Sequence, residues 1–210
     1  MKYASIDLET TGLLHEDAQI LSIGVIIDDL DNPRPYEDLP KMELCLDHER
    51  IAGGIFAIDM NRDLIREIKN KTPKPDRGYH KPIYALERLL KFINYHLNPR
   101  EDPDFRFNVA GKCFATFDDQ LLIRAGDISG QVWDPNNLWA KVRRRRILDP
   151  AILYRQRGDE QLPNLSECLV RAGMEPTSLH NALADAWDVC RLLRQGGPVC
   201  QHQKNESETK

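Results

Sequence analysis

Near its N-terminus the chain contains Tyr3-Ala-Ser-Ile-Asp-Leu-Glu-Thr-Thr-Gly-Leu13, a run of β-forming residues that ends in acids and turn formers. Side chains alternate between the two faces of a strand, so Asp7 and Glu9 project from one face. Two carboxylates on one face repel each other. They are tolerated beside solvent, or they bind a divalent cation that prefers oxygen ligands, such as magnesium or manganese. The turn that follows can add backbone N–H groups and two hydroxyls, which favours a site for a phosphate or sugar.

The rest of the sequence alternates between strand and helix patterns. Four further segments have the composition of strands: 19–27, 42–46, 105–110 and 146–148. Helical periodicity is present in the segments 59–68, 83–93, 116–125, 150–157, 164–172 and 181–195. Three early strands followed by alternating helices and strands predict an α/β fold. We expect a mixed five-stranded sheet, antiparallel at one edge and parallel at the other, flanked by helices.

Composition narrows the class of protein. The 210 residues are 41% hydrophobic and 30% charged, which predicts one globular domain. No apolar run approaches the roughly 20 residues that cross a bilayer. The N-terminus also lacks the apolar segment of a secretory signal, so we expect a cytoplasmic protein without a membrane partner. The five cysteines include no Cys-x-x-Cys pair, which argues against a zinc site or a disulfide framework.

A second acidic element is His180-Asn-Ala-Leu-Ala-Asp185, where the histidine precedes a predicted helix and the aspartate lies in its first turns. Asp185 shares a helical face with Ala182 and Val189, so its carboxylate is expected to point to the packed side. A buried acid needs a partner, which the helix N-terminus or a metal ion can supply. His180 has two possible interpretations. It is either a polar residue at the helix N-terminus with no functional role, or a general base with a near-neutral pKa beside a carboxylate cluster.

A third acidic element, Phe117-Asp118-Asp119, lies where a predicted strand runs into a helix. Asp118 neighbours two leucines at positions i+3 and i+4, whereas Asp119 lies one step further round the helix. Periodicity therefore favours Asp118 as the acid that points inward and leaves Asp119 as the alternative.

Taken together and in order, the three elements resemble the DEDDh group of 3′–5′ exonucleases, which includes proofreading subunits of bacterial DNA polymerases and oligoribonuclease. The five-residue step from histidine to aspartate separates the chain from the related group that uses tyrosine. The resemblance covers roughly residues 2–195, so we expect an exonuclease domain at 1–195 and a disordered tail at 196–210. The matching motifs are Asp7-Leu-Glu9-Thr-Thr-Gly-Leu13, Phe117-Asp118-x-x-Leu-Leu and His180-x-Ala-x-x-Asp185-Ala.

The resemblance implies a ribonuclease H-like fold and a metal-dependent reaction. It implies that two Mg²⁺ (or Mn²⁺) ions are bound by four acids and that His180 takes a proton from the attacking water. Two ions about 3.5 to 4 Å apart suit an in-line displacement at phosphorus. Products would be nucleoside 5′-monophosphates released from the 3′ end of single-stranded DNA or RNA. The four implied metal ligands are Asp7, Glu9, Asp118 and Asp185.

The same resemblance implies a pocket for the terminal nucleotide. Its lining would be Thr10, Thr11, Gly12 and Leu13, with Leu13 wedged against the base and the backbone near Gly12 close to the 3′-hydroxyl. Phe114 would add a stacking surface. The chain departs from the family at this point, because many relatives have His-Asn-Ala where it has Cys113-Phe114-Ala115.

The net charge of −4 gives the whole molecule no general attraction for nucleic acid, so local basic patches must hold the strand. Residues 62–91 contain nine Lys or Arg against four acids, and residues 141–146 contain five Lys or Arg. Each run is either a solvated face or a phosphate-binding surface.

Two other functions remain open, a non-catalytic nucleic-acid-binding module and an endonuclease that cleaves RNA. A polymerase partner, a homodimer and a setting in DNA repair are also left open.

Overall fold

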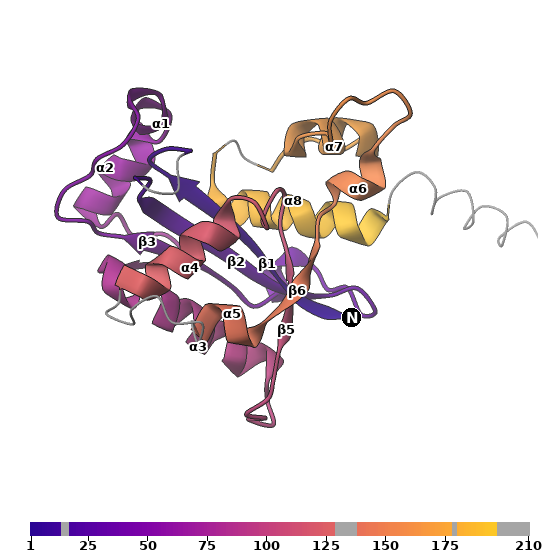
Figure 1. Cartoon of the computed structure of the whole chain (residues 1–210), viewed down its shortest axis with the longest axis horizontal. Coiled ribbons are helices and arrows are strands. Elements are labelled where there is room, and N and C mark those ends of the chain that lie inside the picture. Colours follow the sequence, from indigo (N-terminus) through magenta and orange to yellow (C-terminus); the bar gives the residue numbers. More distant parts are fainter. Residues whose placement is uncertain (14–16, 129–137, 178–179, 197–210) are drawn as a thin grey trace, which may run out of the picture.

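The computed structural model describes residues 1–13, 17–128, 138–177 and 180–196. The predicted tail therefore lies, apart from Gly196, outside the described residues. Within the described residues six strands form one sheet in the order β4-β3-β2-β1-β5-β6 (Figure 1). The strands are β1 (Lys2–Thr10), β2 (Ile20–Asp29), β3 (Lys41–Leu46), β4 (Arg77–His80), β5 (Phe107–Ala110) and β6 (Arg143–Leu148).

The directions of the strands agree with the sequence-based expectation of a mixed sheet. β1, β2 and β3 pair as an antiparallel meander, whereas β5 and β6 join β1 in parallel. The predicted number of five strands is wrong, because β4 pairs in parallel with β3 at the other edge. Its sequence, Arg-Gly-Tyr-His, has no alternation of apolar residues that would reveal a strand. Arg77 holds it in place through two hydrogen bonds to the buried carboxylate of Glu43, at 2.7 and 2.9 Å.

Helices cover both faces of the sheet (Figure 1). The apolar residues of β1 that include Ile6 and Leu8 pack with α3 (Ala85–Leu97), α4 (Asp118–Ile128) and α5 (Leu138–Val142). On the other face Tyr3 packs with α8 (Ala182–Gln195). α7 (Leu165–Ala172) and α6 (Ala151–Tyr154) pack on the outer side of α8. α2 (Arg62–Asn70) packs against β3, and α1 (Ile55–Met60) lies next to α2. The predicted helix at 150–157 is shorter than expected because Arg155 has extended backbone angles.

The N-terminal end of α8 lies directly on β2 at Gly24. A Cβ atom at Gly24 would lie 2.2 Å from the carbonyl carbon of Ala182, so any larger residue would push the helix away. Gly24 is also the residue opposite Asp7 in the β1–β2 pairing. One turn further along the helix, Ser5 Oγ donates a 2.8 Å hydrogen bond to the carbonyl oxygen of Ala186. These two contacts place the first turn of α8 over Asp7.

None of the described helices combines the length and apolarity that a membrane-spanning segment requires.

We expect Gly24→Ala to destabilise the protein by about 1–3 kcal/mol or more, since the new methyl group meets backbone rather than a flexible side chain. Thermal unfolding measures the change. Gly54→Ala is the matched control, because a Cβ at Gly54 meets no atom closer than 3.9 Å. Its cost is expected to stay under about 1 kcal/mol, the usual difference between glycine and alanine at a helix N-cap. Equal unfolding temperatures for Gly24→Ala and the wild type would contradict the close contact.

Candidate metal centre

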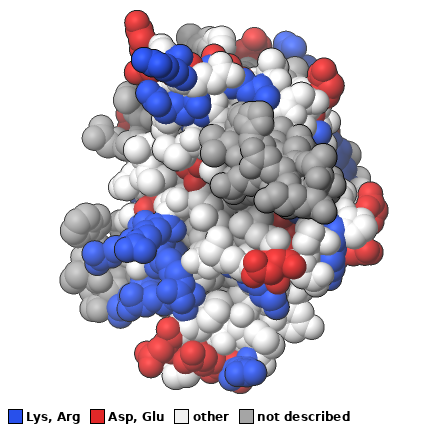
Figure 2. All heavy atoms as spheres, turned by 90° about the vertical axis from the view of Figure 1, so that its right-hand side faces the viewer, with Lys and Arg blue, Asp and Glu red and all other residues white. Residues whose placement is uncertain are grey.

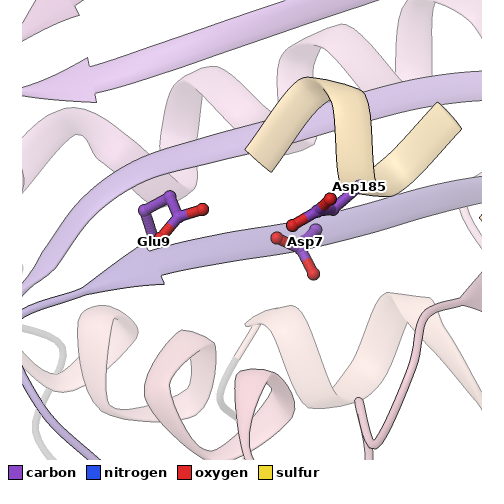
Figure 3. A group of neighbouring side chains, drawn as sticks. All are labelled: Asp7, Glu9 and Asp185. Carbon is purple, nitrogen blue, oxygen red and sulfur yellow. The ribbon is translucent and has the colours of Figure 1, made fainter. Parts of the chain in front are cut away.

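Three carboxylates meet where β1 runs beneath the first turn of α8. Asp7 and Glu9 project from the same face of β1, and Asp185 points down from α8 (Figure 3). One carboxylate oxygen from each of the three lies within 4.8 Å of the other two. Glu9 is buried, and Asp7 and Asp185 are partly exposed. Carboxylate oxygens in this arrangement are the ligands that magnesium and manganese prefer.

Asp118 is the first residue of α4 and lies beside this group rather than within it. It is 5% exposed, and its negative charge raises the pKa of Asp7. Its neighbour Asp119 makes different contacts, because it accepts hydrogen bonds from Trp139 Nε1 (2.8 Å) and Arg143 Nη2 (2.5 Å). The structure thus separates the two candidates that periodicity left open: Asp118 acts on the cluster and Asp119 is bound to core residues.

The acids repel one another strongly in the absence of a cation. Burial raises the pKa of Asp7 well above its usual range, and Asp118, Asp185 and Glu9 raise it further. Burial is also the main cause that raises the pKa of Asp118 and of Asp185 to about 7. Burial and then Asp185 raise the pKa of Glu9 to about 7, although a hydrogen bond from Asn61 opposes the shift. Within the described part of the chain, no Lys, Arg or His forms an ion pair with any of the four acids.

Two residues near Glu9 were missed by the sequence analysis. Ser22 lies opposite Glu9 in the β1–β2 pairing, and its buried hydroxyl has no hydrogen-bond partner. Asn61 donates to the carbonyl oxygen of Thr10 at 3.2 Å, and its buried Oδ1 atom is likewise without a partner. The sequence did carry a signal for the first of these. Ser22 and Gly24 are the only breaks in the apolar run 20–27, and they face Glu9 and Asp7 across the pairing.

These unpaired oxygens and uncompensated carboxylates fit one or more hydrated divalent cations. The donor set consists of oxygen atoms only, which suits magnesium or manganese better than a metal that prefers sulfur. Deprotonated carboxylates are required to hold such an ion, so protons compete with it as the pH falls toward 7.

The turn after β1 is fixed by its own hydrogen bonds and by a neighbouring glycine loop. Thr10 Oγ1 donates to the carbonyl oxygen of Gly12 at 2.9 Å, and Thr11 Oγ1 accepts from the N–H of Gln19 at 2.9 Å. Gly54 N–H donates to the carbonyl oxygen of Thr11, also at 2.9 Å. The two threonine side chains are therefore buried and already bonded, while Leu13 is 82% exposed. Of the four residues predicted to line the pocket, Leu13 and Gly12 remain accessible to a ligand.

His180 lies just before Asn181, the residue that caps α8 by accepting a hydrogen bond from the N–H of Ala184. Its side chain is exposed, and its backbone is left-handed with a φ of 53°. Left-handed backbone is uncommon for residues other than glycine, although histidine adopts it more often than most.

Phe114 lies inside the core. It is 0% exposed, and its ring lies 6.3 Å from that of Trp139, centroid to centroid. The prediction of a stacking surface at Phe114 is wrong, since a base cannot reach a ring without exposed area. Burial of the large apolar ring in the core removes apolar surface from water, which lowers the free energy of the folded state.

Comparison with known proteins identifies the fold. No protein-family model and no curated protein matches the chain. The chain does match solved structures of E. coli exonuclease I, and each match covers 92% of this chain and 40% of that protein. The complex with a 5cy-dT13 oligonucleotide matches with a TM-score of 0.62 at 12% identity. The zinc-bound form with single-stranded DNA gives 0.61 at 12%, and the complex with a dT13 oligonucleotide gives 0.57 at 15%.

The sheet and its covering helices are thus a ribonuclease H-like fold, as the sequence analysis expected. The chain spans 40% of the length of exonuclease I.

We expect the acidic cluster to make the metal-free protein less stable as the pH rises from about 4 to about 7. An acid whose pKa is higher in the folded state stabilises the fold below its unfolded pKa, and that stability is lost as the pH rises through the folded pKa. Asp185→Asn removes one of these acids. In EDTA at pH 8 the variant should unfold several degrees above the wild type, and the difference should vanish near pH 4.

Adding Mg²⁺ at pH 8 should raise the unfolding temperature of the wild type more than that of Asp185→Asn, since the variant lacks one ligand. A variant that is less stable than the wild type in EDTA at pH 8 would show that the carboxylate is already compensated in the folded protein.

Proposed function

We propose that the chain is a metal-dependent 3′–5′ exonuclease that releases nucleoside 5′-monophosphates from the 3′ end of single-stranded DNA or RNA. One observation carries the proposal. Asp7, Glu9 and Asp185 bring oxygen atoms within 4.8 Å of one another, with Asp118 beside them and without an ion pair from any described residue. Carboxylates crowded together without compensation are what a pair of divalent ions and a phosphate group would stabilise.

The fold supports the proposal in a second way. E. coli exonuclease I, which has the same fold, has been solved with single-stranded oligonucleotides and with a zinc ion. The proposal is further supported by the proximity of Asp7, Glu9 and Asp185 and by the effect of the Asp118 charge on the pKa of Asp7, since these acids belong to the three motifs of the DEDDh resemblance.

In the proposed reaction the four acids bind metal ions and the histidine acts as the general base. Asp7, Glu9, Asp118 and Asp185 would hold two Mg²⁺ or Mn²⁺ ions. When bound, such ions lower the pKa of a water molecule and stabilise the leaving 3′ oxygen. His180, on the exposed segment before α8, would accept the proton of the attacking water.

The terminal nucleotide would be held by the turn that follows β1. Leu13 offers an exposed apolar side chain against which a base can pack, and the backbone near Gly12 can bond the 3′-hydroxyl. Thr10 and Thr11 would act by fixing this turn, because their side chains are already hydrogen-bonded within it. Phe114 has no part in the proposal, since it is buried.

The direct test uses single-stranded DNA and RNA oligomers labelled at the 5′ end. With Mg²⁺ or Mn²⁺ we expect progressive shortening from the 3′ end, and with EDTA we expect none. Asp7→Ala should abolish cleavage and leave the fold intact, because the substitution removes a like charge from a repulsive cluster. Internal cuts would favour an endonuclease, and binding without cleavage would favour a non-catalytic module. Cleavage by Asp7→Ala at the wild-type rate would exclude this cluster as the active site.

A second test compares the two neighbouring aspartates of α4. We expect Asp118→Asn to lose cleavage while its unfolding temperature stays the same or rises. Asp119→Asn should instead lose about 3 kcal/mol or more of stability, because it leaves the buried guanidinium of Arg143 without its anion. Thermal unfolding and the oligomer assay, both below the unfolding temperature, measure the pair. A folded but inactive Asp119→Asn beside a fully active Asp118→Asn would reverse the assignment.

A further inference from the structure

A basic segment forms the free edge of the sheet beyond β5. It comprises Lys141 at the end of α5 and Arg144, Arg145 and Arg146 in β6, all of which are exposed. Arg143 differs from them, because it is largely buried and paired with Asp119. We call these four exposed residues the β6 basic edge. Figure 2 views the right-hand side of Figure 1 and shows Lys and Arg atoms gathered in dense groups rather than evenly mixed with Asp and Glu.

Among the described residues, the β6 basic edge places four cations without an acidic partner within six residues of the chain. In the part of the chain that the structure describes, no acid pairs with any of the four, and Arg144 Nε only donates to the carbonyl oxygen of Arg106 at 3.2 Å. The larger basic stretch at 62–91 is different, since most of its cations form ion pairs with nearby acids. Those pairs are Arg62–Asp59, Arg66–Asp63, Lys69–Asp47, Lys71–Asp47, Lys74–Glu67, Arg77–Glu43, Arg77–Glu67 and Lys91–Glu87.

The backbone also sets this segment apart. Phe107 pairs with Arg143 and Val109 pairs with Ile147, so two steps along β5 correspond to four along β6. The arginines between these pairs bulge out of the regular ladder. Bulges re-aim side chains, and they also protect an edge strand from pairing with another chain. A row of guanidinium groups is a good match for phosphates, which they can bind in bidentate fashion.

The β6 basic edge lies within reach of the candidate metal centre. β1, β5 and β6 are parallel, and Ser5, Ala110 and Leu148 are aligned across them. Asp7 lies two residues past this line and Arg146 two residues before it. With ordinary strand spacing, and with the rise per residue halved where β6 bulges, the Cα atoms of Asp7 and Arg146 are about 15 Å apart. A few nucleotides of single strand can span such a distance.

We propose that the β6 basic edge binds the phosphodiester backbone of the same single strand whose 3′ end lies at the metal centre. The inference rests on the proposed function and extends it by naming where the strand runs. The acids at the centre repel phosphates, and the net charge of the protein is −4, so attraction must come from uncompensated cations nearby. The β6 basic edge supplies such cations within the described structure.

The test uses Arg144→Gln/Arg145→Gln/Arg146→Gln, in which Arg143 and its buried partner are left intact. Binding of a fluorescent oligomer of about 16 nucleotides, the upper end of ordinary site sizes, is measured by anisotropy with Ca²⁺ in place of Mg²⁺. We expect affinity to fall roughly 10- to 100-fold at about 0.1 M salt. The slope of log K against log salt should lose about 2 units, since each single-strand phosphate contact contributes about 0.7. DNA and RNA oligomers should respond alike, because the phosphate is common to both.

The control variant is Arg62→Gln/Arg66→Gln/Lys91→Gln, which removes the same charge from exposed cations that are already paired. Its salt slope should remain close to that of the wild type. Equal losses in the two variants would mean that only net charge matters, and wild-type binding by the β6 variant would overturn the inference. A β6 variant that aggregates while its soluble fraction binds normally would assign the arginines to edge protection alone, which also overturns it.

Hydrolysis of the p-nitrophenyl ester of thymidine 5′-monophosphate separates this inference from the proposed function. This small substrate reaches only the metal centre, so the β6 variant should hydrolyse it at the wild-type rate while it cleaves the long oligomer more slowly. If the wild type does not hydrolyse the small substrate or shorten oligomers, the proposed function fails, whereas the salt slope still decides the binding role of β6.

Discussion

The candidate site depends on the close contact between α8 and β2 at Gly24. Because Gly24 has no side chain, the helix backbone at Ala182 comes down onto the sheet, and Asp185 in its first turn meets Asp7 and Glu9. The result is an energetic conflict, since carboxylates are buried together and raise one another's pKa. The packing of the core maintains this repulsion, and a bound divalent cation would relieve it. Carboxylates whose pKa values are raised by burial and by one another are typical of functional sites.

Most of the fold could be predicted from periodicity, because the strands near the N-terminus and the longer helices have strong apolar patterns. α7 is one example, because the predicted helix at 164–172 matches the observed Leu165–Ala172, and its start is fixed by a capping box between Asn164 and Glu167. β4 escaped prediction because Arg77 and its neighbours join the sheet through pairing with β3 and a buried ion pair, neither of which leaves a local pattern. Short elements of this kind are determined by tertiary contacts.

The acids of the candidate site could be found in the sequence because each stands at a strand or helix end with a distinct neighbourhood. Their convergence depended on the family resemblance, since no local pattern says that Asp7 and Asp185 meet. Phe114 was assigned wrongly because an aromatic residue after a strand fits both a stacking surface and a core position, and only the packing against Trp139 decides between them. Ser22 was overlooked because its role is visible only once the register with Glu9 is known.

The measurement that tests the central claim most directly is X-ray diffraction from crystals soaked in Mn²⁺, with data collected at the manganese absorption edge. If Asp7, Glu9 and Asp185 share a divalent cation, the anomalous difference map will contain a strong peak within coordination distance of all three carboxylates. A map in which this space holds no peak, while the carboxylates keep the positions described above, would contradict the account.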